Sequence, residues 1–190
     1  MRRYILTGAP GSGKTTILRA LAERGYTVVA EAAADVVARE QARGVDAPWQ
    51  DASFIDAVVK LQQERQQQHP LDGAAVQLYD RSPICTLALA RYSGLPTTRA
   101  LRAEVNRVVQ YEIYEPLVFF IALHGPVEPT ATRRISEADA RRFEQVHRAA
   151  YESCGYELVD IPAAALDHRV DLIDDVLADE DVRYSEEAWS

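Results

Sequence analysis

Short apolar runs and longer segments of helical period alternate along the whole chain. Five apolar runs, ended by glycine or polar residues, predict strands: residues 4–7, 26–29, 74–79, 117–121 and 156–160. Six segments with helical spacing predict helices over residues 14–23, 32–43, 53–69, 98–111, 137–153 and 163–177. A seventh helix is predicted to begin at Ser82-Pro83. This alternation predicts an α/β fold, with a doubly wound, five-stranded parallel sheet covered by helices on both faces.

Two predicted helices carry more specific expectations. In the helix over 53–69, Phe54, Val58 and Leu61 lie on one side, and we expect the glutamine-rich opposite side to be polar. The closing helix is predicted to end at Leu177, and the acidic tail over 179–190 is expected to fray. No repeat or linker divides the chain, so residues 1–178 are predicted to form one domain.

Polar and small residues follow several predicted strands directly. Gly8, Glu31, Asp80 and His124 each come just after a strand. Because ligands of open α/β sheets bind beyond the carboxyl ends of the strands, we expect these residues to gather at one edge.

A phosphate-binding motif begins where the first predicted strand ends. Eight consecutive residues match G-x-x-x-x-G-K-[ST]: Gly8, Ala9, Pro10, Gly11, Ser12, Gly13, Lys14 and Thr15. Such a loop wraps phosphates with backbone N–H groups and presents a helix N-terminus to them. Lys14 is expected to reach the β- and γ-phosphates of ATP, Thr15 to ligate Mg²⁺, and Thr16 to complete the nucleotide site. The motif therefore predicts a P-loop NTPase fold with ATP and Mg²⁺ as cofactors.

Asp80 and Arg81 end the third predicted strand, where P-loop proteins carry an acidic metal-binding residue. Asp80 is a candidate Mg²⁺ ligand, directly or through water, or else a plain cap for the helix at Ser82-Pro83. Arg81 either points toward the substrate or its phosphate, or is a surface arginine.

Glu31 follows the second predicted strand, at the edge that would border an acceptor pocket. A carboxylate there could take the proton of an acceptor hydroxyl or bind its hydroxyl groups. The alternative is a glutamate that complements the dipole of the following helix. Asp35 lies one helical turn further along on the same face.

The segment over about 125–136 is polar, lacks a period and carries Arg133 and Arg134. We expect it to be a mobile lid that closes over ATP, with arginines that neutralise charge on the transferring phosphate. Arg141 and Arg142, in the following helix, either act on the phosphate together with Arg133 and Arg134 or belong to a solvated basic face.

Composition limits the class of protein. The 190 residues carry a formal net charge of -8, which argues against a nucleic-acid binder. No apolar run approaches membrane-spanning length, and we expect no signal peptide, because the first residues lead directly into a predicted strand. Cys85 and Cys154 match no metal-ligand spacing, so we expect buried thiols in a reducing cytoplasm. The chain is thus expected to be cytoplasmic, and its oligomeric state stays open.

These residues together resemble the small AAA-like P-loop domain family that includes the ribosylnicotinamide kinase domain, and more distantly deoxynucleoside and nucleoside monophosphate kinases. The resemblance covers most of the chain: the loop at 8–15, Glu31, Asp80-Arg81-Ser82, and the blocks at 134–136 and 151–162. It implies that Arg134 belongs to a lid over ATP. It also implies that Asp80-Arg81 corresponds to the acidic-Arg-Ser signature of deoxynucleoside kinases, and Glu31 to their acceptor-side carboxylate.

The expected function is transfer of the γ-phosphate of ATP to a nucleoside-like or other small hydroxylated metabolite. The alternative is a regulatory or interaction ATPase without a small-molecule acceptor. The chain is short for a hexameric motor with an extra helical domain, and it has no Asn-Lys-x-Asp guanine signature, since Asn106 is its only asparagine. Both observations favour the kinase.

Overall fold

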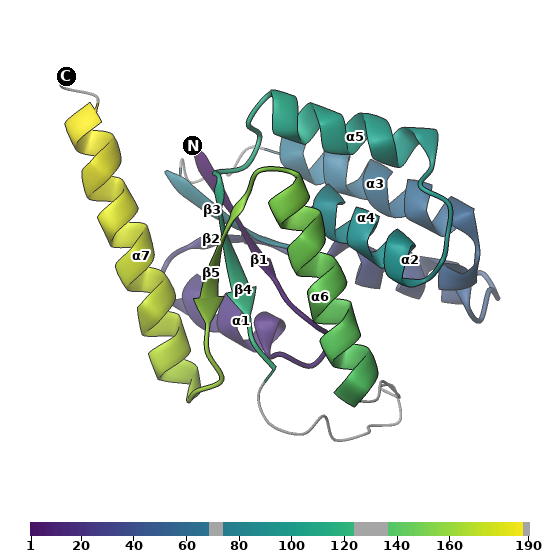
Figure 1. Cartoon of the computed structure of the whole chain (residues 1–190), viewed down its shortest axis with the longest axis horizontal. Coiled ribbons are helices and arrows are strands. Elements are labelled where there is room, and N and C mark those ends of the chain that lie inside the picture. The colour runs from purple at the N-terminus through teal and green to yellow at the C-terminus, as the bar shows by residue number, and fades with distance from the viewer. Residues whose placement is uncertain (69–73, 124–136, 188–190) are drawn as a thin grey trace.

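The computed structural model describes residues 1–68, 74–123 and 137–187, apart from the side chains of residues 137, 182 and 185–187. Figure 1 shows a central sheet with helices packed on both sides. The strands are β1 (Arg2–Thr7), β2 (Thr27–Val29), β3 (Val76–Asp80), β4 (Leu117–Ile121) and β5 (Glu157–Ile161). The helices are α1 (Lys14–Glu23), α2 (Ala32–Gln41), α3 (Ala52–Gln67), α4 (Pro83–Tyr92), α5 (Arg99–Gln110), α6 (Glu137–Ser153) and α7 (Leu166–Glu187), with a 3₁₀ turn over Pro48–Gln50.

The sheet confirms the predicted α/β fold. Its strands are ordered β2-β3-β1-β4-β5, and every neighbouring pair is parallel. The strand order reverses at β1, which pairs with β3 on one side and β4 on the other. The loop after β1 therefore lies at the topological switch point, where open α/β sheets bind their ligands.

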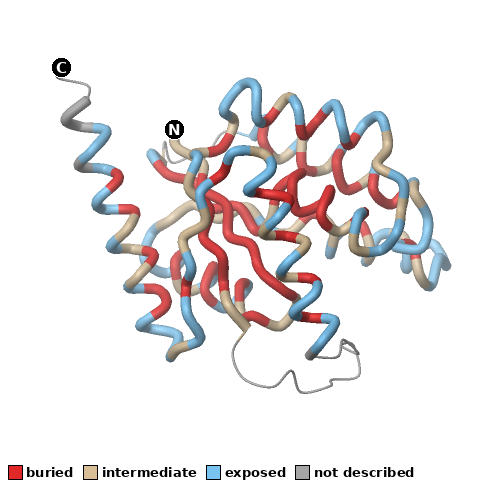
Figure 2. Tube along the Cα trace, viewed as in Figure 1, coloured by how far each residue is buried: buried red, intermediate tan, exposed pale blue. Residues whose placement is uncertain are grey.

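Alternation along β1 divides the core into two layers. Tyr4 and Leu6 are buried in the layer that α1 and α7 cover, together with Ile17 and Ile173. Ile5 points to the opposite face and is buried with side chains from α2 to α6. Figure 2 shows the resulting buried centre between the two helical layers. Most positions of a strand that is buried on both faces are apolar, as in β4, which explains the near-continuous apolar run of the sequence there.

The predicted end of the last helix at Leu177 is wrong, because α7 continues to Glu187. The acidic extension packs against the start of the sheet instead of leaving it. Arg2 of β1 forms an ion pair with Asp181, and the Tyr184 hydroxyl donates a hydrogen bond to Glu115, just before β4. These partners are distant in sequence, so no local signal indicated them.

The expected polar face of α3 is also partly wrong. Gln62 and Gln66 are buried, because α4 and α5 pack over this side of the helix. Gln62 Oε1 accepts a hydrogen bond from Thr86 Oγ1 at 3.2 Å, and Gln66 Nε2 donates one to the Tyr114 hydroxyl at 3.0 Å. A buried amide is tolerated where its polar atoms are paired in this way.

Two further sequence expectations can be compared with the model. Cys85 is buried and Cys154 is half-buried, and both are free thiols. Within the described residues, no helix combines the length and the apolar character needed to cross a membrane.

Candidate functional site

The loop between β1 and α1 adopts the conformation that its glycines allow. Gly8, Gly11 and Gly13 have φ angles of 138°, 90° and 88°, which residues with a side chain rarely adopt. At Gly8 space is limiting as well, since a Cβ would lie 2.4 Å from the carbonyl oxygen of Ile121 in β4. The glycines thus let the loop curl closely over the end of the sheet.

Lys14 turns back into this loop. Its Nζ donates to the carbonyl oxygens of Gly8 and Ala9, at 3.0 and 2.8 Å, and to Ser12 Oγ at 3.3 Å. Burial and the nearby Arg81 guanidinium lower the pKa of Lys14 to about 7. An ammonium group is therefore held where the loop would receive an anion.

Arg169, which the sequence analysis did not identify, contacts the phosphate loop. Arg169, in the first turn of α7, is only 4% exposed. Its guanidinium donates to the carbonyl oxygen of Ser12 in the loop and to that of Ala122 after β4, both at 2.9 Å. Arg169 therefore joins the last helix, the phosphate loop and the end of β4. Its partner in the loop is 157 positions away, so no motif could have indicated the contact.

Replacing Arg169 with methionine is expected to lower the free energy of unfolding by about 1–3 kcal/mol, because the carbonyl groups of Ser12 and Ala122 lose a buried donor. Nucleotide affinity should fall as well, since the loop loses its support. Thermal unfolding and titration with a fluorescent ATP analogue measure the two effects. Arg24→Met is the matched control, because Arg24 only pairs with Asp171 and Asp174 at the surface. Unchanged affinity in the Arg169 variant would show that the contact does not shape the loop.

Asp80 lies at the end of β3 and is buried. Its Oδ1 atom is enclosed and has no hydrogen-bond partner among the described residues. Burial and the Glu31 carboxylate raise the pKa of Asp80. The capping alternative is wrong, because Ser82 caps α4 by accepting a hydrogen bond from the Ile84 N–H at 3.2 Å.

A cavity of 310 Å³ beside α1 is lined by both Asp80 and Thr15. A carboxylate and a threonine hydroxyl are the kinds of oxygen ligand that Mg²⁺ prefers, and the Asp80 Oδ1 atom lacks another partner. The two residues predicted to hold the metal therefore border one space.

Arg81 is not the surface arginine of the alternative interpretation. Its φ angle is 73°, its side chain is 13% exposed, and its guanidinium lies over the ring of Phe143, 5.9 Å from the centroid. Burial lowers the pKa of Arg81, but Glu31 and other nearby groups outweigh that effect and raise it overall. The arginine thus stays charged inside the site.

Glu31 faces Arg81 across this space. Its Oε1 atom lies 2.6 Å from Arg81 Nε, an ion pair in which the N–H bond is not aligned with the oxygen. Glu31 occupies the N-cap position of α2, yet its side chain makes no capping hydrogen bond. Asp35, the neighbouring candidate, forms an ion pair with Arg65 of α3.

The Glu31–Arg81 pair borders a second cavity, of 150 Å³, beside the phosphate loop. Pro10 of the loop, Gln62 of α3 and Phe143 of α6 line it as well. The sequence analysis did not identify Gln62 and Phe143 as site residues, because each appears in the sequence as an ordinary residue of a predicted helix. The cavity presents a carboxylate, a guanidinium and an amide, with one aromatic wall.

Buried polar groups underlie the cavity. The Tyr151 hydroxyl lies 2.7 Å from Ser82 Oγ and 2.9 Å from Cys85 Sγ, and Cys85 Sγ lies 3.1 Å from Thr7 Oγ1. His147, to which the sequence assigned no role, stacks on Phe143 with 3.9 Å between ring centroids. Burial and Arg81 lower the pKa of His147 to about 3, so the ring is neutral.

Several predicted site residues lie outside the described residues. They are His124, the proposed lid over 125–136, and its arginines Arg133 and Arg134. Arg142, a possible companion, lies over the Tyr92 ring at 5.6 Å from its centroid. Of the four residues expected at the carboxyl edge of the sheet, Gly8, Glu31 and Asp80 lie at the ends of β1, β2 and β3, and His124 lies outside the described residues.

Sequence comparison places most of the chain in one family. A family model described as "AAA domain" matches residues 3–169. No curated protein matches the sequence.

Solved structures of P-loop kinases resemble the fold. The chain is similar to deoxyadenosine kinase from M. mycoides with bound dATP, with a TM-score of 0.58, 14% identity, and 94% of this chain and 100% of that chain covered. It is similar to the NadR protein in complex with NAD and AMP-PNP, with a TM-score of 0.64, 16% identity and 92% of this chain covered, and it spans 48% of that chain. Shikimate kinase from Acinetobacter baumannii in complex with shikimate gives a TM-score of 0.54 at 16% identity, with 94% of each chain covered. At these identities the likeness establishes the fold, a small P-loop kinase fold.

Proposed function

The chain belongs to the AAA domain family, and on that premise we propose that it is an ATP-dependent kinase that phosphorylates a small hydroxylated metabolite. The observation that carries the proposal is the Glu31–Arg81 pair, which lines a cavity together with Pro10 of the phosphate loop. An acceptor that receives the γ-phosphate needs a binding space beside the phosphate loop, and this cavity offers one.

ATP and Mg²⁺ fit the residues of the loop. Backbone N–H groups of the glycine-rich turn and the Lys14 ammonium would hold the phosphates. Thr15 and Asp80 would hold Mg²⁺, which supplies positive charge shared between the β- and γ-phosphate oxygens.

We call the cavity of 150 Å³ that Glu31 and Arg81 line the acceptor cavity. The residues around it can carry out the transfer. Glu31 accepts a hydrogen bond from the acceptor hydroxyl, orients it toward the γ-phosphorus, and takes its proton as the new oxygen–phosphorus bond forms. The bond between the γ-phosphorus and the bridging oxygen breaks, and ADP leaves with that electron pair. Arg81 neutralises charge on the moving phosphoryl group. The Gln62 amide and the Phe143 ring bind the remainder of the acceptor.

This lining supports a proposal for the class of acceptor. A charged pair suits hydroxyl groups, and an amide beside an aromatic ring suits a flat polar ring such as that of a nucleoside. The named neighbours act on or bind deoxynucleosides, NAD or shikimate, all of which carry hydroxyl groups. The proposal therefore covers nucleoside-like and other hydroxylated metabolites.

Acceptor-dependent release of ADP tests the function. Purified protein with ATP and Mg²⁺ is incubated with a panel of nucleosides, nucleotides and hydroxylated acids, and ADP is measured by a coupled assay. A kinase releases ADP faster with its acceptor and yields a phosphorylated product by mass spectrometry. A rate that no acceptor changes would favour the alternative, a regulatory ATPase.

Replacing Asp80 with asparagine is expected to lower Mg²⁺-dependent turnover by about 10²-fold or more, because the metal loses a charged oxygen ligand. Stability should hold, since burial already disfavours the charge of Asp80. Turnover and thermal unfolding are compared with those of Asp160→Asn, which removes an exposed carboxylate from β5. Full activity in excess chelator would contradict the assignment of Thr15 and Asp80.

ATP binding is expected to weaken as the pH rises above about 7. Burial holds the pKa of Lys14 at about 7 in the free protein, whereas bound phosphates keep the lysine protonated. The complex then binds more protons than the free protein, so the dissociation constant rises with pH, by up to about tenfold per unit. Calorimetric titrations on both sides of pH 7 measure this slope. Lys14→Arg should flatten it, because a guanidinium stays charged.

A further inference from the structure

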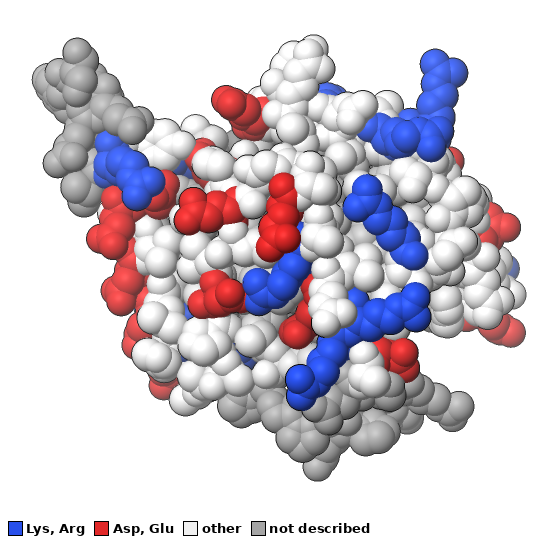
Figure 3. Space-filling model, viewed as in Figure 1, with Lys and Arg blue, Asp and Glu red and all other residues white. Residues whose placement is uncertain are grey.

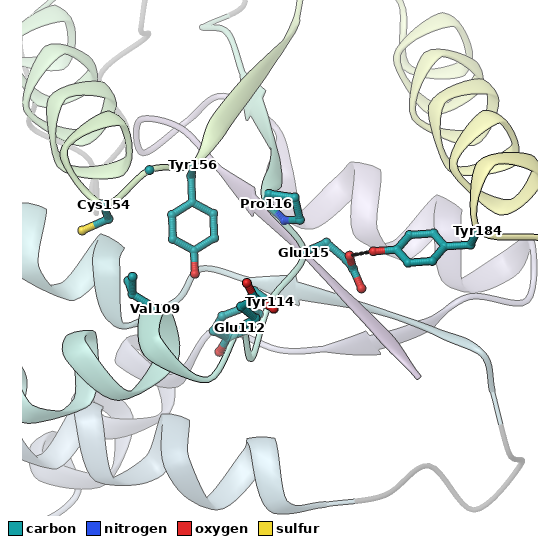
Figure 4. Close-up of a pocket in the computed structure, with 9 residues that line it drawn as sticks. Val109, Glu112, Tyr114, Glu115, Pro116, Cys154, Tyr156 and Tyr184 are labelled. Carbon is teal, nitrogen blue, oxygen red and sulfur yellow. Dashed lines mark hydrogen bonds between the residues drawn. The ribbon is translucent and has the colours of Figure 1, made fainter. Parts of the chain in front are cut away.

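A larger cavity lies at the opposite end of the sheet from the phosphate loop. It has a volume of 480 Å³ and is enclosed by the segment before β4, the turn between α6 and β5, and the last turns of α7 (Figure 4). This volume falls within the range of small-molecule sites, ~300–1,000 Å³. Nothing in the proposed phosphate transfer uses this space.

The polar groups that line the cavity are mainly hydrogen-bond acceptors. Glu112 and Glu115 contribute two carboxylates from the segment before β4, and Figure 4 shows both beside the cavity. The Tyr184 hydroxyl donates to Glu115 and so fixes this carboxylate between the sheet and α7. Among the described residues no lysine, arginine or histidine lines the cavity. Arg2, which lies over the Tyr184 ring, is paired with Asp181.

Tyr156 supplies an independent sign of a ligand. The residue is only 8% exposed, and its ring packs edge-on against Tyr151 at 5.8 Å between centroids. Its hydroxyl points into the cavity in Figure 4 and makes no hydrogen bond within the described part of the chain. Burial raises the pKa of Tyr156 to about 12, so the group is a neutral phenol. The hydroxyl is not among the enclosed polar atoms that lack a partner, so it meets the open space of the cavity and is free to bond to a molecule that enters there.

The rim adds apolar surface. Val109 and Tyr184 are 37% and 41% exposed there, although both are large apolar or aromatic side chains. They offer contact to methylene groups next to a charged end. The surrounding charge is negative: the chain carries -8 overall, and Figure 3 shows carboxylates along the side formed by α7. Such a field draws cations toward this side of the molecule.

We propose that this cavity binds a small organic cation that carries ammonium or guanidinium N–H groups on a short alkyl chain. Two carboxylates and a phenol oxygen accept its N–H bonds, and the tyrosine rings face its positive charge. A divalent metal suits the cavity less well, because no group of three or more metal-ligating side chains gathers in the described residues.

Agmatine is a suitable probe, since it carries a guanidinium and an ammonium group on four methylenes. Its binding to the full chain is measured by calorimetry, with the neutral compound pentylurea as the probe control. We expect agmatine to bind and pentylurea to bind at least about tenfold more weakly, because only agmatine forms charge-assisted hydrogen bonds. Glu112→Gln and Glu115→Gln should each weaken agmatine binding about tenfold or more, and Tyr156→Phe should weaken it measurably.

Glu152→Gln is the matched control for charge. Glu152 is exposed at the end of α6, close to the cavity in sequence, but it does not line it. Its replacement should leave agmatine affinity unchanged. If Glu152→Gln and Glu115→Gln weaken agmatine binding equally, the binding reflects only general attraction by an acidic surface, and the proposal is overturned. Equal binding of pentylurea, or no agmatine binding at millimolar concentration, would overturn it as well. Thermal unfolding of each variant confirms that a loss of binding is not a loss of fold.

Discussion

Replacing Lys14 with alanine is expected to lower ATP turnover by about 10³–10⁵-fold, the range known for a single cationic side chain that neutralises a transferring phosphoryl group. The Lys14 ammonium sits inside the loop, in contact with the carbonyl oxygens of Gly8 and Ala9. Arg81 pairs with Glu31 on the lining of the cavity beside the loop and already has its own proposed role there, so it does not replace the ammonium inside the loop. No described neighbour is placed to take over the charge.

The fold should survive this change. Burial lowers the pKa of Lys14, which means that the folded protein holds the charged form at a cost. Removing the ammonium relieves that cost and offsets the lost hydrogen bonds. Steady-state turnover, ATP affinity and thermal unfolding are compared with those of Lys60→Ala, which changes the chain's only other lysine, at an exposed position on α3. Wild-type affinity and turnover in the Lys14 variant would rule out this loop as the nucleotide site.

Replacing Glu31 with glutamine is expected to lower acceptor-dependent turnover by about 10²–10⁴-fold, the usual cost of losing a general base. Glutamine keeps the shape of the side chain and can still contact Arg81, but it cannot take a proton. ATP affinity should stay normal, because Glu31 is not part of the loop that would hold the phosphates. Background hydrolysis should also persist, since water can react without the acceptor.

The pattern of effects separates a site residue from a helix-start residue. Acceptor-dependent and background turnover, ATP affinity and thermal unfolding are measured for Glu31→Gln and for Glu40→Gln. Glu40 lies on the same helix but pairs only with Arg39 and Arg43 at the surface. Normal transfer with weakened folding in the Glu31 variant would show that Glu31 is only a helix-start residue, and the position of the acceptor site would then be unknown.

Local patterns were sufficient for the elements of the fold. The five predicted strands are all present, and their bounds in the structure differ from the predicted ones by a few residues. Patterns failed where an element's surroundings decide its character. Gln62 is polar by type, yet α4 and α5 cover it. The helix α7 continues past Leu177, where Asp181 pairs with Arg2 and Tyr184 bonds to Glu115.

The sequence by itself determined the phosphate loop and the edge of the sheet at which Glu31, Asp80 and Arg81 meet. Glycine spacing dictates the turn, and parallel strands place their carboxyl ends side by side whatever their order. Only the tertiary structure decided which groups touch. It paired Glu31 with Arg81 and brought Arg169 against Ser12 across 157 positions. It also turned the unmarked Tyr156 toward the cavity at the far end. Such contacts depend on packing between segments that are distant in the sequence, and the local pattern of apolar and polar residues does not indicate this packing.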